Sequence, residues 1–345
     1  MSKKAGPVHI GPARTLPPKR EGGCLDYTAP DPIGMQHSPR GRLTPPAGRL
    51  QSEQEAAMQT LRKIVPAAVF GALLSLLTYF VLSDWGNSAG DFTWPWRAAR
   101  LLLGGDNPYR EILPSGDYPY NDYFYYPLPT ALFAIPFSIL PPYAAGALFY
   151  GASSGLLFYA IRRERPYLWP VFLSAPFYIA MTVAQWSPLL MAAALLPDAW
   201  HWLWILKPTT GKGVLFVIVL LALSLPVLPS WPADYLHIYS LTQSERYGVP
   251  LFQPGGAVLL LALLALRRPE GRALLAASVM PRNPYWYDGV MLWLVPQSLR
   301  QSLLLSILSW VAWFGLMAGP RPGMLALAAW PWQIALLYAP CAVMV

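Results

Sequence analysis

The amino-acid sequence predicts an all-α polytopic membrane protein, a bundle of transmembrane helices with about 8–10 membrane segments, some of them short or re-entrant. Three observations support this fold class. Hydrophobic residues make up 55% of the chain and charged residues 12%, whereas about a quarter of the residues of a soluble domain are charged. Apolar runs such as Ile64–Leu82 recur and reach the length of about 20 residues that a spanning helix needs. Arginine and lysine cluster between these runs.

The first segment, residues 1–63, is predicted to be a disordered basic cytoplasmic tail, ahead of a transmembrane domain over 64–345. It holds ten Lys or Arg against five Asp or Glu and few large apolar side chains, and it accounts for most of the net charge of +8. Such a composition buries too little surface to offset the entropy of ordering. A basic tail beside a span attracts anionic lipid headgroups. Membrane lipids, and no nucleic acid, are therefore the expected partners.

The basic tail places the N-terminus inside, since Lys and Arg near spans stay in the cytoplasm. The run Ile64–Leu82 begins too late for a cleaved signal and is expected to cross outward. Residues 83–142 then form an outer loop with interfacial helices. Within this loop, residues 127–142 are short and proline-rich, so they lie along the surface. Tyr143–Ile161 returns to the inner arginine cluster that follows it.

The directions of the later spans follow because consecutive spans cross the membrane in opposite directions. We expect Tyr167–Gln185 to cross outward and Trp186–Leu206 to return as one helix. Val214–Leu228 then crosses outward again, and residues 230–253 form a second outer loop. Gly255–Leu266 returns to the inner side. Residues 273–300 hold two short apolar halves around a polar centre. Broken helices of this kind face protein or a water-filled cavity. Ser302–Met317 and Met324–Val343, the latter interrupted by Pro331, close the bundle. No internal repeat is evident, which weighs against a transporter built from inverted halves.

The stretch "GDFTWPWRAARLLLGGDNPY", residues 90–109, places charges directly after the first span. Trp94, Arg97, Arg100 and Leu101 occupy neighbouring helical positions, which predicts an amphipathic helix with its apolar side in lipid. Its arginines are either an interfacial belt or ligands of a phosphate, which the planar guanidinium can hold with two hydrogen bonds. Asp91 is either a cap or dipole partner of this helix or a reactive carboxylate.

Two further groups of side chains in the outer loop have alternative interpretations. Asp106 is typical of a turn with Asn107 and Pro108. In "DYPYNDYFYYPLPT" the tyrosines surround Asp117 and Asp122. Tyrosines are common at membrane interfaces, but rings beside carboxylates also suit a sugar, whose apolar face stacks while its hydroxyls donate.

The order of these features resembles a known family. After the first span come "GDF", "RAARLLLGGDNPY" and "YYPLPTALFAIPFSILP", and after a spacer "AQWSPLLMAAALL" and "ILKPTTG". Over residues 60–300, and best over 83–142, this order is similar to that of the GT-C glycosyltransferases, specifically glycosyltransferase family 87, which includes polyprenyl-phosphomannose-dependent mannosyltransferases. The family often has "GQ" followed by a small polar residue where this chain has Ala184, Gln185 and Trp186.

The resemblance implies transfer of a sugar, mannose or another hexose or pentose, from a polyprenyl-phosphate donor to a hydroxyl of a glycolipid, glycan or protein acceptor, with inversion. The matching general base is Asp91. The candidates for binding the donor phosphate are Arg97, Arg100, Lys207 and Arg246, and those for binding substrate are Asp106, Tyr109, Asp122, Tyr126, Gln185 and Asp288. The leaving group is a phosphate, so no second carboxylate is needed as acid.

Two of these assignments have structural alternatives. The predicted topology puts Lys207 near the inner face, so either residues 186–206 form a kinked hairpin helped by Pro188 and Pro197, or Lys207 is a membrane anchor. Asp288 lies between two half-spans, where an acid is a functional candidate, or it forms an ion pair with Arg282. His237 is expected to be an ordinary interfacial loop residue.

The expected setting is the plasma (inner) membrane, with the active site on the extracytoplasmic side. Cys24 and Cys341 offer neither a disulfide framework nor a metal pair, and no cofactor or metal is expected. Two other functions fit the same sequence. A transporter or flippase would line its substrate path with Asp91, Lys207 and Asp288. An inert scaffold would use the outer loop to hold a partner.

Overall fold

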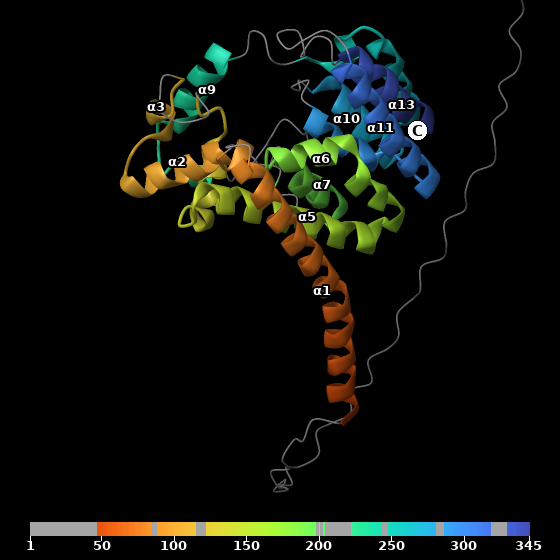
Figure 1. Ribbon diagram of the computed structural model, residues 1–345, viewed down its shortest axis with the longest axis horizontal. Helices are drawn as coiled ribbons and strands as arrows, with labels where there is room; N and C mark the ends of the chain where they lie inside the picture. Colours follow the sequence, from red (N-terminus) through yellow and green to blue (C-terminus); the bar gives the residue numbers. More distant parts are fainter. Residues whose placement is uncertain are drawn as a thin grey trace, which may run out of the picture. The chain divides into compact units, whose positions relative to one another are not determined.

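The protein is described here by a computed structural model that covers residues 47–84, 88–114, 122–197, 200, 203, 222–242, 248–280, 286–318 and 330–345. By its contacts the chain divides into two units, Met1–Gln51 and Ser52–Val345. The described residues are mainly helical and contain no β-strand (Figure 1). The prediction of an all-α fold is confirmed to this extent. Residues 1–46 of the predicted disordered tail lie outside the described residues, whereas residues 47–63, predicted to belong to the same tail, form the first part of a long helix that ends at Asp84.

Three helices are long and apolar enough to cross a membrane. They are the Leu61–Asp84 part of α1 (Ala47–Asp84), α5 (Pro142–Glu164) and α11 (Leu299–Met317). Each coincides with a span predicted from the sequence, and each is long enough to cross a hydrocarbon core of about 30 Å, or nearly so. Membrane association is thereby supported, while the larger GT-C-like bundle and its orientation remain predictions.

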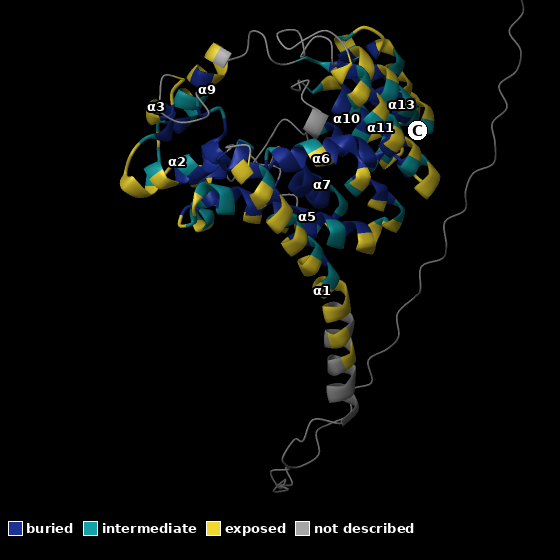
Figure 2. Cartoon of the chain, in the orientation of Figure 1, coloured by how far each residue is buried: buried dark blue, intermediate teal, exposed yellow. Residues whose placement is uncertain are grey.

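The three long helices differ in how much of them the protein covers. Within the most apolar window, 67% of α5 is buried, against 33% of α11 and 17% of α1. Figure 2 shows that α1 is largely exposed, whereas two shorter helices, α6 (Ala175–Thr182) and α7 (Ser187–Leu195), are largely buried. In a protein that crosses a membrane, exposed apolar side chains such as Leu73 and Phe80 on α1 face lipid. Helix α5 is therefore the most completely covered of the three long helices.

The region after α5 is broken into short helices. A 3₁₀ helix, η3 (Pro166–Leu173), is followed by α6 (Ala175–Thr182) and α7 (Ser187–Leu195). Ser174 separates the first two in extended conformation and caps α6 by accepting the N–H of Phe177 at 3.3 Å. Ala184, with a φ of +46°, turns the chain between α6 and α7. The predicted segment Tyr167–Gln185 is thus not a continuous helix.

The prediction of one helix over Trp186–Leu206 is wrong. Helix α7 ends at Leu195, and Leu196 is extended with a ψ of 162°. A residue before proline avoids the helical region because the proline ring crowds it, and Pro197 follows. Pro188 lies in the first turn of α7, where a missing N–H is tolerated. Apart from Trp200 and Leu203, residues 198–206 lie outside the described residues, as does Lys207, which directly follows the predicted helix.

Several shorter helices complete the described chain. Residues 127–142, predicted to be too short to span, contain α4 (Leu128–Ala134) and η2 (Ile135–Phe137). The predicted break in residues 273–300 separates α10 (Pro269–Val279) from η8 (Trp286–Leu294), and η7 (Gly256–Ala265) precedes them. The described part of the last predicted span contains a π-helix, Ile334–Tyr338, followed by α13 (Ala339–Met344). Residues 230–253, predicted to form a second outer loop, contain α9 (Trp231–Thr242).

The amphipathic helix predicted in the outer loop is α2 (Thr93–Gly104). Its apolar side was expected to lie in lipid, and this is wrong. Trp94 and Trp96 are buried within the protein, where α2 packs against α4. The indole N–H of Trp96 donates to the carbonyl of Leu140 at 3.1 Å. The periodicity correctly identified an apolar face, but protein covers that face.

Candidate functional site

Asp91 lies in η1 (Gly90–Phe92), a single 3₁₀ turn between the first span and α2. Its N–H donates to the carbonyl of Val183 at 2.7 Å, which ties the turn to the loop between α6 and α7. Gly90 makes this approach possible, because a Cβ there would lie 2.4 Å from the Val183 oxygen and its φ is +62°. The Asp91 side chain is half-buried. A backbone contact thus sets the position of this carboxylate.

Gln185 is the side chain that meets Asp91. Its amide Nε2 donates a short hydrogen bond to Oδ2 of Asp91, although the two residues are 94 positions apart. The Gln185 carbonyl Oε1 accepts the N–H of Trp186 at 2.8 Å. Because that acceptor is used by the backbone, the NH₂ group must face Asp91. Gln185 is 1% exposed, so its amide is held in one orientation.

Asp91 is not the side-chain cap predicted as its alternative role. Helix α2 takes Phe92 as its N-cap and has no side-chain cap hydrogen bond. Instead, a threonine side chain binds the backbone at the start of η1: the hydroxyl oxygen of Thr93 accepts the N–H of Ala89, the residue before η1, at 2.9 Å. The carboxylate is therefore directed to Gln185 and not to the helix end.

An aromatic cluster packs behind the Asp91–Gln185 pair. Trp186, fully buried, has its ring centroid 4.7 Å from that of Phe149, 5.6 Å from Phe133 and 5.7 Å from Phe92. Phe92 and Phe149 stack at 4.2 Å. Such pairs contribute about 0.5–1.5 kcal/mol each beyond area burial. Since Phe92 and Trp186 directly follow Asp91 and Gln185 in the chain, the cluster holds both ends of their hydrogen bond.

The predicted substrate tyrosines border this cluster. The ring of Tyr126 lies 6.3 Å from Trp186, and its backbone carbonyl accepts the hydroxyl of Tyr109 at 2.9 Å. Burial, with smaller contributions from Tyr235 and Asp234, raises the pKa of Tyr109 above its usual value. The Tyr109 hydroxyl therefore stays protonated and joins α3 (Pro108–Glu111) to the segment before α4.

A second polar group, not predicted from the sequence, joins α3 to α9. Asn107 caps α3 by accepting the N–H of Tyr109, and its amide donates to Oδ2 of Asp234 at 2.8 Å. Ser230 donates to the same oxygen at 2.8 Å, and Arg110 lies 4.0 Å from the other. Burial raises the pKa of Asp234, but these donors and Arg110 outweigh it and hold the pKa below its usual value. The sequence signal that could have identified this group is Ser230, which lies four residues before Asp234 at the start of a helix.

The remaining predicted residues that the structure describes are spread over several elements. Arg97 is half-buried on α2, and Arg100 is exposed with its guanidinium 5.0 Å from the centre of the Trp96 ring. Asp106 is exposed in the turn after α2, as its turn-forming pattern predicted. Asp122 accepts the N–H of Tyr123 at 2.9 Å. Asp288 is half-buried in η8, a helix that packs on α6 and α7.

Three other predicted positions, Lys207, Arg246 and Arg282, lie outside the described residues, as does Asp117. In the part of the chain that the structure describes, no group of three or more His, Cys, Asp or Glu side chains is arranged to hold a metal ion. His237 is exposed on α9. Cys341 is buried in α13.

A cavity of about 610 Å³ lies between α1 and α5. Its lining is apolar apart from Ser75, Tyr159 and Trp200, and it includes none of the predicted site residues. The Asp91–Gln185 pair and this cavity are therefore separate features. Comparison of the chain with protein-family models, with curated proteins and with solved structures finds no match.

Proposed function

We propose that the protein is a membrane glycosyltransferase that moves a sugar from a polyprenyl-phosphate donor to an acceptor hydroxyl. One observation carries the proposal: Asp91 and Gln185, both selected from the sequence as site residues, are hydrogen-bonded although 94 positions separate them. The carboxylate follows a helix long enough to span a membrane, so in the proposed topology it lies where a lipid-linked donor and a water-soluble acceptor meet.

The proposed reaction is a single displacement at the anomeric carbon. The acceptor oxygen attacks this carbon and forms the new glycosidic bond, while the bond to the phosphate oxygen breaks and its electron pair leaves with the phosphate. Asp91 takes the proton of the attacking hydroxyl. A positioned general base of this kind contributes about 10²- to 10⁴-fold. The configuration inverts because attack and departure are on opposite sides of the carbon.

Gln185 acts as a positioning residue in this mechanism. Its amide is neutral, so it orients the Asp91 carboxylate without supplying a competing charge. A carboxylate has about four acceptor sites, and one amide bond leaves capacity for an acceptor hydroxyl. The buried side of the pair, formed by Trp186 and Phe92, excludes water from one face of the site.

The leaving phosphate requires cations, and Arg97 and Arg100 follow Asp91 on the next helix. Arg100 is exposed and rests on the Trp96 ring, which limits its freedom before a phosphate binds. Arginine suits this role because its fork donates two hydrogen bonds to one phosphate group. Lys207 and Arg246 stay in the proposal as sequence-based candidates.

The test is sugar transfer by purified protein in lipid nanodiscs, with radiolabelled polyprenyl-phosphate sugars as donors. Asp91→Asn should lower turnover by two to four orders of magnitude, because the amide keeps the shape but accepts no proton. The matched control is Asp84→Asn, which removes an exposed carboxylate seven positions earlier and should leave turnover unchanged.

Retained turnover in Asp91→Asn would remove this residue from the mechanism. Movement of a solute across proteoliposomes without any sugar transfer would instead assign the protein to the transporters. A biological activity that survives Asp91→Asn in cells, with no transfer in vitro, would assign it to the scaffolds.

A further inference from the structure

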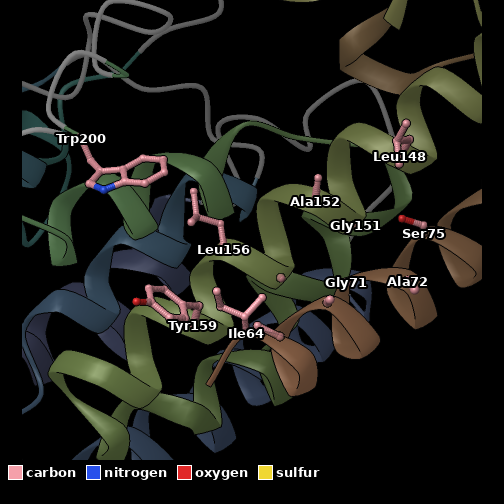
Figure 3. A pocket seen from close by; sticks show the side chains of 13 residues that line it. Ile64, Gly71, Ala72, Ser75, Leu148, Gly151, Ala152, Leu156, Tyr159 and Trp200 are labelled. Carbon is pink, nitrogen blue, oxygen red and sulfur yellow. The ribbon is translucent and has the colours of Figure 1, made fainter. Parts of the chain in front are cut away.

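The cavity between α1 and α5 is a groove open along the outside of the two longest helices. Figure 3 shows the side chains that line it: Gly71, Ala72 and Ser75 on α1 face Gly151, Ala152 and Leu156 on α5, with Trp200 at the edge. Ala68, Ala72 and Ala152 are exposed, so the groove is open to the surroundings of the helices. In a membrane, those surroundings are hydrocarbon chains.

Glycine contacts between the two backbones form the floor of this groove. A Cβ on Gly71 would lie 2.8 Å from the carbonyl oxygen of Gly151, and a Cβ on Gly155 would lie 2.8 Å from that of Ala67. Advancing along α1 from Ala67 to Gly71 thus moves back along α5 from Gly155 to Gly151, so the helices are antiparallel. Helices at this distance make direct backbone contact, and the small side chains beside the contact line leave the space unfilled.

The antiparallel register brings four cations to one end of the groove. Ile64 on α1 and Tyr159 on α5 line that end together (Figure 3). Just beyond them are exposed cations from both helices, and these are Arg62, Lys63, Arg162 and Arg163. By the same register, the two pairs lie within about one helical turn of each other along the axis. Arg162 and Arg163 continue the spacing of Leu156 and Tyr159, so they lie on the groove side of α5, whereas Arg62 and Lys63 lie around α1 from its lining residues.

Two of these cations are already oriented by neighbours. The guanidinium of Arg163 donates to the Tyr159 hydroxyl at 3.5 Å, and its Nε lies 2.8 Å from the carboxylate of Glu164. Arg162 lies over the ring of Phe158, 5.7 Å from its centre. Glu164 balances one positive charge, so this end keeps a positive excess at the level where an apolar groove begins.

We propose that this groove binds an anionic glycerophospholipid. One acyl chain occupies the apolar groove between α1 and α5, and the headgroup phosphate binds at the end of the groove to Arg162 and Arg163 of α5. Charge complementarity decides the occupant: two groove-side guanidinium groups favour an anion, and the apolar walls beyond them favour hydrocarbon. Trp200 at the edge matches the preference of indole rings for the membrane interface. The inference is independent of sugar transfer.

The experiment measures lipid binding to the purified full-length chain by native mass spectrometry. Phosphatidylglycerol and phosphatidylcholine with identical acyl chains are titrated in parallel. The wild-type protein should retain one phosphatidylglycerol in preference to phosphatidylcholine. Arg162→Ala combined with Arg163→Ala should weaken phosphatidylglycerol binding about 25-fold, at roughly five-fold per cation, and change phosphatidylcholine binding little. Ala152→Phe should weaken binding of both lipids, because its ring fills the groove.

Matched variants separate these effects from misfolding. Arg267→Ala with Arg300→Ala removes two exposed cations away from the groove and should leave the preference intact. Arg162→Lys with Arg163→Lys keeps the charge and should keep most of the binding, and Ala152→Ser keeps the groove open. Equal binding of the two lipids to the wild-type chain would overturn the proposal. Equal losses in the groove-end alanine pair and in the Arg267/Arg300 pair would also overturn it.

Discussion

The aromatic cluster at Trp186 and the groove between α1 and α5 use the same helix, α5, in opposite ways. Around Trp186, large rings fill the space completely, and Phe149 of α5 is 1% exposed. Two turns or less further along α5, Gly151 and Gly155 bring two backbones into contact and leave a cavity beside them.

The difference shows how side-chain size divides one helix between two tasks. Interlocking rings permit one arrangement, which suits a carboxylate that must stay within hydrogen-bond distance of an amide. Small residues fix the distance between helices but not what lies next to them, so an adaptable lipid chain can occupy the space. Smaller side chains are therefore expected to disrupt the aromatic cluster, and larger side chains are expected to disrupt the groove.

The largest expected effect is loss of volume in the cluster. Trp186→Ala should lower the free energy of unfolding by about 3–5 kcal/mol, because it removes a fully buried ring that contacts four others. Unfolding of the purified protein in detergent measures this change. Trp169→Ala, at a ring that is 44% exposed, is the control and should shift stability by no more than about 0.5 kcal/mol. Equal effects would mean that the cluster does not hold the site.

The next effect concerns the backbone contact below Asp91. Gly90→Ala forces an alanine into a positive φ, at about 1–2 kcal/mol, and drives its Cβ into the Val183 carbonyl, which adds about 1–3 kcal/mol. Gly105→Ala is the matched control, since its φ is +85° but nothing lies within 4 Å of its Cβ. The difference in unfolding free energy between the two variants isolates the contact with Val183. Sugar transfer should fall only in Gly90→Ala.

A smaller effect is expected from the amide that orients the carboxylate. Gln185→Leu removes the donor to Asp91 and leaves the Trp186 N–H without its side-chain acceptor. One hydrogen bond to a charged group corresponds to about ten- to a hundred-fold in turnover. Steady-state kinetics should show this loss in kcat with little change in KM for the donor. A change confined to KM would argue for substrate binding and against positioning.

The smallest effect lies at the edge of the cluster, where α9 meets α3. The pKa of Asp234 is held below its usual value, so its stabilising contribution is present above the unfolded pKa of about 3.9 and is lost as pH falls below it. The protection of the α9 amides, measured as hydrogen exchange corrected for its intrinsic pH dependence, should therefore decrease as the pH falls from about 5 to about 3. Asp234→Asn should abolish this pH dependence and cost about 1 kcal/mol. Glu111→Gln, an exposed neighbour, should change neither.

The sequence predicted the long helices well and the short ones poorly. Tyr143–Ile161 is an uninterrupted apolar run, and α5 covers it. Between residues 167 and 206, apolarity persists while the backbone turns at Ser174, Ala184 and Leu196. Mean apolarity does not encode such breaks, because they depend on single caps, on a positive φ and on residues before proline.

The sequence predicted which residues belong to the candidate site, but it did not predict how they are arranged in space. Asp91 stood out because a carboxylate beside a span is unusual, and Gln185 because of a resemblance in order. Neither observation predicts the hydrogen bond between the two side chains, because that bond depends on how α6 and α7 fold back on η1. The apolar face of α2 was recognised, but periodicity cannot tell a covering of protein from one of lipid. Asp234 was missed because one of its partners, Asn107, is 127 positions away in the sequence.

The separation of Asp91 and Gln185 along the chain also has a consequence during synthesis. A ribosome adds about 5–20 residues per second, so roughly 5–20 s pass between the emergence of the carboxylate and that of its amide. Throughout that interval the Asp91 carboxylate exists without the amide that contacts it in the folded protein. A polypeptide released before Gln185 is added would carry the acid but could not assemble the pair.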